Sequence, residues 1–330
     1  MARILLTGGS GFIAAHVLDT LLERGHSVAT TVRSEEKAQR IRDAHPGVPK
    51  DKLDFVIVPD IAKPDAFDMA VISNPPFEIV IHTASPFHFR ITDAYEDLIK
   101  PAINGTVGIL RAIKNSAPTV KRVVITSSFA AMIDVTKPST YVYSEVWPYL
   151  HQAHDDWNPM SEAQAGSSPM MGYRASKTFA CNPPLVIGPV VHHLGGLDAI
   201  NTSNERIRDF ITGAAKNGCP RTGTNLWVDV RDIALAHALA AEKPEAANQR
   251  FFIVAGKFCN KEIVEIISNA FPELRSKLPE GEALKPGDYP PEGSFGFSNQ
   301  RSKDILKLTY RPLRESVVDA VKSLQCLMKQ

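Results

Sequence analysis

The chain has 330 residues, of which 44% are hydrophobic and 22% are charged, a composition that is ordinary for a globular enzyme. Its 37 basic and 36 acidic residues leave a formal net charge of +1, which excludes a global field for gathering nucleic acid or an anionic membrane surface. No apolar run approaches the roughly 20 residues that a membrane helix needs.

The first half of the chain alternates short apolar runs with segments of helical periodicity. These features predict strands within residues 3–9, 27–33, 53–61, 78–87 and 120–131, and helices at residues 12–25 and 93–117. Strands that alternate with helices favour a parallel sheet with right-handed crossovers. The apolar runs lack polar alternation, as expected for strands that are covered on both faces. The pattern indicates an α/β fold with a doubly wound parallel sheet.

Beyond about residue 190 the rhythm changes to polar, glycine-containing connections. We expect helices near residues 203–216, 260–270 and 314–328, and a loop in the Pro/Gly-rich segment 279–294. The segment WVDVRDIALAHALAA at 227–241 resembles a motif. A length of 330 residues suits two packed units, so we expect a smaller C-terminal domain beside the sheet.

A glycine-rich turn joins the first expected strand to the first expected helix. Gly8 permits a tight turn, Gly11 lets backbone approach a pyrophosphate, and Ala14 is small enough for the helix to pack closely on the strand. The helix N-terminus offers free N–H groups and a positive dipole end to phosphates. The pattern predicts a dinucleotide site made by Gly8, Gly9, Ser10, Gly11, Phe12 and Ile13. The alternative interpretation is an ordinary glycine-rich turn.

The end of the second expected strand indicates which dinucleotide is bound. An NAD enzyme commonly has a carboxylate here for the ribose hydroxyls, whereas this chain has Arg33 and Lys37. A guanidinium can bind a 2′-phosphate bidentately, and an ammonium can add a second charge. The sequence therefore favours NADPH over NADH. In the alternative interpretation both cations are solvated and are neutralised by the nearby Glu35 and Glu36.

Two further strand ends contribute candidate cofactor residues. After the third strand, the Asp60 carboxylate could accept from the adenine amino group and Ile61 could pack on the ring; alternatively, Asp60 is only a turn residue. Thr83, Ala84 and Ser85 follow the fourth strand at the carboxyl edge of the sheet, where ligands of open α/β sheets bind.

Candidate catalytic residues follow the fifth expected strand. Ser127 and Ser128 close this strand, while Tyr173 and Lys177 lie on one face of an expected helix. A phenol with a pKa near ~10 is a poor acid or base at neutral pH, and a nearby lysine charge favours the phenolate. A serine hydroxyl can hold a carbonyl for proton transfer from the tyrosine. We therefore expect Ser128, Tyr173 and Lys177 to be catalytic, although a YxxxK sequence alone is more commonly surface decoration.

Taken together, these motifs resemble an extended short-chain dehydrogenase/reductase. The motifs are TGGSGFIA, VRSEEKA, VPDI, HTASPF, TSSFAA, YRASK, NPPLVIGP, NTS and VDVRDIA. The set spans nearly the whole chain and is similar to the dihydroflavonol-reductase-like group, particularly its NADPH-dependent methylglyoxal and methylbutanal reductases. The resemblance implies a Rossmann-type fold and hydride transfer from NADPH to an aldehyde or ketone, giving an alcohol.

The same resemblance implies roles for individual residues. Tyr173 would be the proton donor, Lys177 would hold the nicotinamide ribose and tune the tyrosine, and Ser128 rather than Ser127 would orient the carbonyl. Asn104 would support a water relay, with packing inside its helix as the alternative.

Further positions follow from the resemblance or from residue type. Val186 and Ser203 match positions that line the cofactor in this family. Phe87, Phe129 and Met132 are candidates for an apolar substrate pocket or, equally, for the core.

The resemblance also implies two domains with different binding roles. Residues 1–190 would form an NADP-binding Rossmann domain with a later contribution from about 225–255, and residues 191–330 would form mainly a substrate-binding domain. The expected partner is a small-molecule carbonyl compound, with no nucleic acid and no membrane, bound by a monomer or homodimer.

The cysteines and histidines indicate the compartment and argue against a metal site. Cys181, Cys219, Cys259 and Cys326 are far apart and lack metal-ligand spacing, so we expect reduced thiols and no metal. The adjacent pair at residues 192 and 193 is a poor metal ligand set. No signal peptide is evident at the N-terminus, and a cytoplasmic protein is expected.

The join between YRASK and NPPLVIGP is shorter than this fold requires. From Tyr173 to Asn182 a helix would extend roughly 13 Å, whereas a strand crossing the sheet is roughly 17–20 Å long. The chain therefore resembles a family member that lacks roughly twenty residues here, estimated from a typical helix remainder plus half a strand. Either the helix ends just after Lys177 and the next strand is curtailed, or residues from about 145 to 190 repack and move Tyr173.

Three functions are compatible with the sequence. An NADPH-dependent carbonyl reductase is the leading hypothesis. An NADP-binding protein with impaired or no catalysis is the alternative that the short join favours. A sugar-nucleotide epimerase or dehydratase shares the fold and YxxxK, but HTASPF and the pair Arg33 and Lys37 argue against it.

Overall fold

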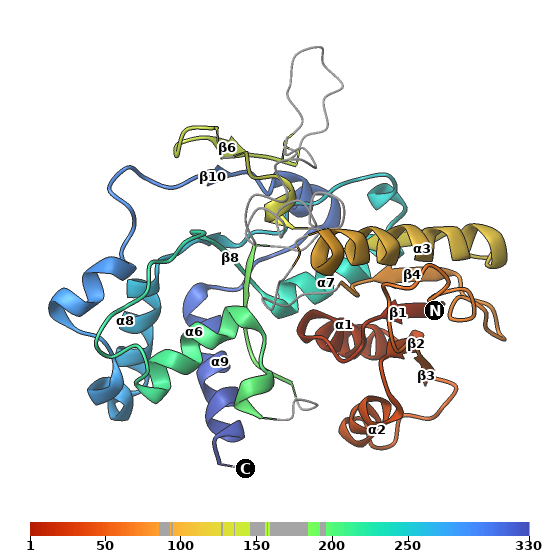
Figure 1. Cartoon of the computed structure of the whole chain (residues 1–330), viewed down its shortest axis with the longest axis horizontal. Coiled ribbons are helices and arrows are strands. Elements are labelled where there is room, and N and C mark those ends of the chain that lie inside the picture. The colour runs from red at the N-terminus through yellow and green to blue at the C-terminus, as the bar shows by residue number, and fades with distance from the viewer. Residues whose placement is uncertain are drawn as a thin grey trace. The chain divides into compact units, whose positions relative to one another are not determined.

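The computed structural model describes residues 1–85, 93, 95–126, 128–134, 136–145, 156, 158, 184–191 and 196–329 (Figure 1). These residues form two compact units. The first unit takes its described residues from Met1–Val135, Val146–Pro183 and Ala234–Arg250, and the second takes them from Thr136–Glu145, Pro184–Ile233 and Phe251–Gln330.

The first unit is built on a five-stranded sheet in which every strand is parallel to its neighbours. Its strands are β1 (Arg3–Thr7), β2 (Ser27–Val32), β3 (Leu53–Ile57), β4 (Ile79–His82) and β5 (Arg122–Ile125). Their order, β3-β2-β1-β4-β5, is the order of a doubly wound Rossmann-type sheet. The predicted fold class is therefore confirmed, and the carboxyl ends of all five strands meet at one edge.

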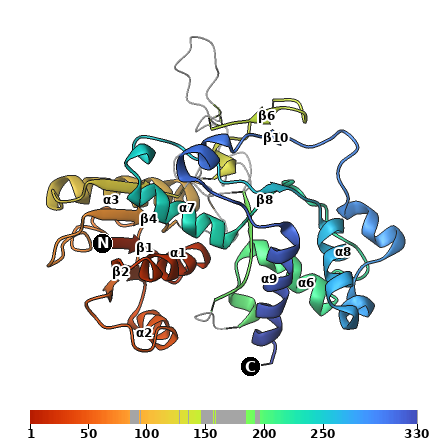
Figure 2. The same ribbon diagram turned by 180° about the vertical axis from the view of Figure 1, so that it is seen from behind.

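Helices cover both faces of this sheet, as the unbroken apolar strands predict. Ile4 and Leu6 point to the face covered by α1 (Phe12–Glu23), α2 (Glu35–Ala44) and the end of α7 (Val230–Glu242). Leu5 points to the other face, covered by α3 (Lys100–Ser116) and by apolar residues between β3 and β4. Figures 1 and 2 show α1 and α3 on opposite sides of β1 and β4.

Helix α2 lies outside the helices that the sequence pattern predicts. Only Ala38 and Ile41 of this helix are buried, so it carries too little apolar periodicity to stand out. Its beginning is defined by local chemistry instead, because the Ser34 side chain accepts a hydrogen bond from the N–H of Lys37 at 3.4 Å. This places Lys37 in the first turn of a helix that starts directly after β2.

The second unit has its own sheet and apolar core. Strands β7 (Leu185–Ile187), β8 (Leu226–Asp229) and β9 (Gly256–Lys257) form a sheet in the order β7-β8-β9. Helices α6 (Thr202–Thr212), α8 (Asn260–Ala270) and α9 (Leu313–Leu327) contribute to the core of this unit. The three helices predicted near residues 203–216, 260–270 and 314–328 are thus present.

Short elements complete the described chain. A two-stranded parallel sheet pairs β6 (Val142–Tyr143) with β10 (Gly296–Phe297). Short 3-10 or π-helices occur at η1 (Tyr95–Ile99), η2 (Phe129–Ala131), η3 (Leu197–Ala199), η4 (Pro244–Ala246), η5 (Pro272–Lys277), η6 (Gly281–Gly287) and η7 (Ser302–Leu306). The segment expected as a loop at residues 279–294 therefore contains one short 3-10 helix.

A buried ion network explains the polar residues of the VDVRDIA motif. The Asp229 carboxylate is fully buried and accepts hydrogen bonds from Arg231 Nε at 3.0 Å, Arg231 Nη2 at 2.8 Å and Ser316 Oγ at 2.5 Å. Arg231 Nη1 also donates to Asp319 at 2.8 Å. Burial works to raise the pKa of Asp229, but the hydrogen bonds from Arg231 and Ser316 outweigh it and the pKa is lowered. The network ties the start of α7 to α9 within the second unit.

In the part of the chain that the structure describes, no helix is long and apolar enough to span a bilayer.

Replacing Arg231 by Met should destabilise the protein, because it leaves the Asp229 carboxylate buried without its cation. We expect the free energy of unfolding to fall by about 2 to 3 kcal/mol, less than for a fully buried pair because Arg231 is partly exposed. Denaturant unfolding followed by circular dichroism measures the change. Lys261→Met, which removes an exposed ion pair with Asp288, is the matched control and should have little effect. Equal losses in the two variants would contradict this account of the network.

Candidate functional site

A pocket of about 250 Å³ lies at the carboxyl ends of the strands of the first unit. Its wall is formed by the last two residues of β2 and by residues from the segments that follow β1, β2, β3 and β4. The lining residues are Gly8, Ser10, Gly11, Thr31, Val32, Arg33, Lys37, Val58, Ile61, Thr83, Ala84 and Ser85. The structure thus brings most of the predicted cofactor residues together around one hollow.

The glycine-rich turn uses part of its hydrogen-bonding capacity inside the protein. Gly8 has a φ of 77°, which permits the turn closed by the hydrogen bond from Gly11 N–H to Gly8 O at 2.8 Å. Gly8 N–H donates to Thr31 Oγ1 and Gly9 N–H donates to Thr31 O, each at 2.9 Å. These two amides are therefore engaged within the protein. The sequence pattern does not single out Thr31, because its role depends on a contact with a distant strand.

The first turn of α1 provides the donors for an anion. Helical N–H groups at this position have no intrahelical acceptor, and Gly11 at the N-cap offers no side-chain cap. The amides of Phe12 and Ile13 thus lie at the positive end of the helix dipole, directly after Gly11, which lines the pocket. Their role in binding a phosphate remains a prediction.

Gly9 is required by packing against β2. A Cβ atom built on Gly9 would lie 2.1 Å from Thr30 Oγ1 and 2.8 Å from Thr30 Cγ2, well inside any real contact distance. Thr30 cannot turn away freely, because its hydroxyl donates to Leu6 O at 2.9 Å and its side chain is fully buried. The backbone of the turn can therefore approach β2 only where this residue has no side chain.

Arg33 and Lys37 form a cationic end of the pocket. The alternative that Glu35 and Glu36 neutralise them is not supported, because both carboxylates bind other arginines. Glu35 Oε1 lies 2.5 Å from Arg42 Nη1, and Glu36 Oε1 lies 2.7 Å from Arg40 Nη2. Within the described residues, neither Arg33 nor Lys37 has an ion-pair partner. Both side chains are exposed and line the pocket. A site for a phosphate beyond the pyrophosphate of a dinucleotide requires such accessible cations.

Asp60 and Ile61 take different parts at the end of β3. Ile61 lines the pocket, whereas Asp60 accepts the Ala62 N–H through Oδ1 at 2.9 Å. The adenine-binding role of Asp60 remains a prediction. Asn104 of α3 donates from Nδ2 to Ala62 O at 2.8 Å and so holds the segment after β3, and its part in a water relay remains a prediction.

Ser128 sits just after β5 with its hydroxyl partly engaged. Its side chain caps η2, because Oγ accepts the Ala130 N–H at 2.8 Å, and the residue is 4% exposed. The backbone N–H of Asn158 donates to Ala131 O at 2.8 Å and so holds the same turn. Among the described residues, no further partner uses the second lone pair or the hydroxyl hydrogen of Ser128, and both could serve a substrate carbonyl or another hydroxyl.

The remaining predicted residues lie in several places. Tyr173, Lys177, Ser127, Phe87 and the histidine pair at 192 and 193 fall outside the described residues. Phe129 and Met132 are buried. Val186 in β7 and Ser203 in the first turn of α6 belong to the second unit. No cluster of three or more potential metal ligands occurs among the described residues.

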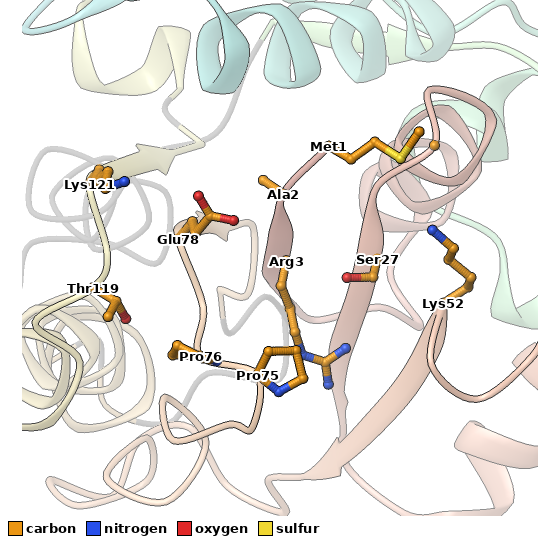
Figure 3. Close-up of a pocket in the computed structure, with 11 residues that line it drawn as sticks. Met1, Ala2, Arg3, Ser27, Lys52, Pro75, Pro76, Glu78, Thr119 and Lys121 are labelled. Atoms are coloured by element: carbon orange, nitrogen blue, oxygen red, sulfur yellow. The ribbon is translucent and has the colours of Figure 1, made fainter.

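A larger hollow of about 470 Å³ lies at the opposite, amino-terminal edge of the same sheet (Figure 3). Arg3 in its wall already has partners within the protein: Nε donates to Ser73 Oγ at 2.9 Å, and Nη2 lies 3.9 Å from Asp54. Ligands of open α/β sheets bind at the carboxyl ends of the strands. The carboxyl-edge pocket is therefore the candidate functional site.

A known protein family matches the part of the chain that contains the carboxyl-edge pocket. The model of the NAD dependent epimerase/dehydratase family matches residues 4–255, which include the five-stranded sheet except its first residue, Arg3, and the residues that line the carboxyl-edge pocket.

Characterised relatives match nearly the full length of the chain. Ketoreductase azaE of Aspergillus niger is 43% identical, with 98% of this chain and 97% of the relative aligned. NADPH-dependent methylglyoxal reductase GRE2 of Saccharomyces cerevisiae is 33% identical over 97% of both chains. The crystal structure of yeast Gre2 complexed with NADPH superposes with a TM-score of 0.84 at 31% identity, covering 99% of each chain.

Gly9→Ala should disturb both folding and the pocket, because the added methyl group overlaps Thr30. We expect the free energy of unfolding to fall by roughly 1 to 3 kcal/mol, with weaker binding of a dinucleotide. Gly218→Ala is the control, since nothing lies within 4 Å of its Cβ position. Thermal unfolding and fluorescence titration measure the two effects. A Gly9→Ala protein as stable as the control would contradict the packing role.

Proposed function

Because the chain belongs to the NAD dependent epimerase/dehydratase family, we propose that it is a reductase that converts aldehydes or ketones to alcohols with NADPH. The proposal rests on the composition of the carboxyl-edge pocket. Its wall contains the cations Arg33 and Lys37 and also Gly11, the N-cap of α1. Relatives named as an NADPH-dependent methylglyoxal reductase and a ketoreductase support the reaction class.

The residues of the pocket fit NADPH. The Phe12 and Ile13 amides suit the pyrophosphate, because they are the donors that the turn leaves unused. Arg33 and Lys37 suit the 2′-phosphate, since their neighbouring carboxylates are occupied by Arg40 and Arg42. Ile61 provides an apolar surface for the adenine ring. The pyrophosphate, the 2′-phosphate and the adenine ring would thus be bound by residues that follow β1, β2 and β3, respectively.

NADPH supplies a hydride to the carbonyl carbon when it is bound. The chain's own residues would handle the proton and the oxygen. In this proposal Ser128 donates a hydrogen bond to the carbonyl oxygen, and Tyr173 transfers a proton to that oxygen as it gains electrons. Lys177 keeps a positive charge beside the phenol, which lowers its pKa and eases the proton transfer. The product is the alcohol.

The short join after Lys177 motivates a second candidate function, a protein that binds NADPH without turnover. The alignment with ketoreductase azaE extends over 342 residues, more than the length of this chain, so the relative has residues without a counterpart here. Strand β7, which follows the join, is only three residues long. Both observations are compatible with lost support behind Tyr173 and Lys177.

We further propose a cytoplasmic location. Cys219 and Cys259 are free and buried, and Cys326 is free and exposed. Thiols that persist without pairing are typical of a reducing compartment.

Replacing Arg33 and Lys37, which have no ion-pair partner among the described residues, should change the preference for NADPH over NADH. Charge-assisted hydrogen bonds to a phosphate are worth roughly 1.5 to 3 kcal/mol, so Arg33→Ala with Lys37→Ala should weaken NADPH binding roughly tenfold or more. NADH, which lacks the 2′-phosphate, should bind as before. Lys121→Ala, which removes an exposed cation at the opposite, amino-terminal edge of the sheet, is the control. Calorimetric titration measures both cofactors. Equal weakening of NADPH and NADH would contradict the assignment of the 2′-phosphate.

Loss of the phenol should abolish turnover selectively. We expect Tyr173→Phe to lower kcat roughly 10²-fold or more, because general acid catalysis contributes on that scale. NADPH oxidation should be followed with a panel of aldehydes, diketones and keto esters. Turnover in the parent that is lost in the variant supports the reductase. A parent that binds NADPH but turns over no carbonyl compound supports the second candidate.

A further inference from the structure

Three nitrogen atoms converge on the hydroxyl of Thr7 at the end of β1. Thr7 Oγ1 lies 3.1 Å from the backbone N of Thr83, 3.1 Å from the backbone N of Ala84 and 2.9 Å from Nδ1 of His82. The Thr83 hydroxyl in turn donates to Thr7 O at 2.5 Å. Thr7 is fully buried, and His82 is 3% exposed. The end of β1 is therefore joined to the end of β4 by side-chain and backbone hydrogen bonds outside the strand ladder.

The donors around Thr7 decide where its own hydrogen points. A hydroxyl oxygen has two acceptor lone pairs and one hydrogen. The amides of Thr83 and Ala84 can only donate, so they occupy both lone pairs. The hydroxyl hydrogen is then directed to His82, and Nδ1 of the imidazole must accept it. His82 is accordingly neutral, with its proton on Nε2.

The surroundings of the imidazole agree with this tautomer. Nε2 has no hydrogen-bond partner among the described residues, so a charged ring would hold a buried N–H donor with nothing to stabilise it. Burial alone lowers the pKa of His82 to about 4. The ring packs edge to face against Phe67, with centroids 5.6 Å apart, in the apolar layer beneath α3. Protonation would also present a third donor to Thr7 Oγ1.

The residues that Thr7 holds are the wall of the cofactor pocket. Thr83 and Ala84 line it, and a Cβ atom on Gly8 would lie 3.1 Å from Ala84 Cα, so the glycine-rich turn rests directly on this segment. The carbonyl of His82 accepts the Thr126 N–H at 3.0 Å, which extends the same contacts to the strand that precedes Ser128.

We propose that Thr7 and His82 are positioning residues for NADPH: neutral His82 orients the Thr7 hydroxyl so that Oγ1 accepts both amides and fixes Thr83 and Ala84 against the glycine-rich turn. This inference rests on the proposed function for its cofactor. Neither side chain lines the pocket, so both act on NADPH through the residues that they hold.

Cofactor affinity tests the role of the hydroxyl. Thr7→Val keeps the shape but leaves the Thr83 and Ala84 amides without an acceptor, and we expect the Kd for NADPH to rise roughly tenfold or more. Thr7→Ser restores the hydroxyl and should return the Kd to within about threefold of the parent. Thr119→Val is the control, since its hydroxyl donates to Phe77 O at 2.8 Å in the same unit and borders the amino-edge hollow. Fluorescence of bound NADPH gives Kd, and unfolding curves give stability.

Three results separate positioning from general structure. A rise in Kd for Thr7→Val, rescue by Thr7→Ser and an unchanged Kd for Thr119→Val support the proposal. An unchanged Kd in Thr7→Val overturns it. Equal effects of Thr7→Val and Thr119→Val also overturn it, because they would report a general loss of stability. A parent protein that binds no NADPH contradicts the proposed function instead. In that case the hydrogen bonds around Thr7 are tested by the His82 tautomer, which needs no cofactor.

The tautomer can be read without cofactor or variants. Long-range ¹H–¹⁵N correlation spectra of the parent distinguish a protonated from an unprotonated ring nitrogen. We expect His82 to show Nε2 protonated and Nδ1 unprotonated, and to stay neutral at pH 6, where an ordinary imidazole with a pKa of ~6.5 is mostly charged. A proton on Nδ1 at neutral pH, or a charged ring at pH 6, would overturn the arrangement around Thr7.

Discussion

The close approach of β1, β2 and β4 at their carboxyl ends is the constraint on which the site depends. Thr30 of β2 leaves no room for a side chain on Gly9, and Thr31 binds the amides of Gly8 and Gly9. Thr7 binds the two amides that follow β4. The strands thus hold the glycine-rich turn in place and bind the amides of Gly8 and Gly9. The N–H groups of the first turn of α1 are not used in these contacts.

The groups at the pocket that are available to a ligand carry positive charge or partial positive charge. The first turn of α1 offers N–H donors, and Arg33 and Lys37 have no carboxylate partner within the described chain, since Glu35 and Glu36 bind Arg42 and Arg40. A pocket with donors at one side and free cations at another attracts a ligand that carries phosphate at two separate places. NADPH has this distribution of charge, whereas NADH lacks the phosphate that Arg33 and Lys37 would bind. In the proposed site, the preference for NADPH depends on the ion pairs of Glu35 and Glu36 in α2 as well as on Arg33 and Lys37.

Much of this arrangement can be predicted from the sequence, because it depends on local patterns. Apolar runs without alternation predict the parallel strands, and each strand end then places its following residues at one edge. The roles of Thr7, Thr30 and Thr31 cannot be predicted in the same way, since each depends on a contact between segments far apart in the chain. Helix α2 does not follow from the apolar pattern, because only two of its residues are buried. The glycine pattern places Gly9 in the site, but its steric contact with Thr30 depends on the distant strand β2. Tyr173 and Lys177 lie outside the described residues, so their catalytic roles stay predictions.

The central claim is that the chain transfers a hydride from NADPH to a carbonyl carbon. The most direct test uses NADPH carrying deuterium at C4 of the nicotinamide, in separate samples labelled on each face, with the carbonyl compounds that the parent consumes. Mass spectrometry of the alcohols should show one deuterium on the former carbonyl carbon from one labelled face and none from the other. Alcohol that forms without deuterium from either sample, or no alcohol from any compound while NADPH is bound, would contradict the claim.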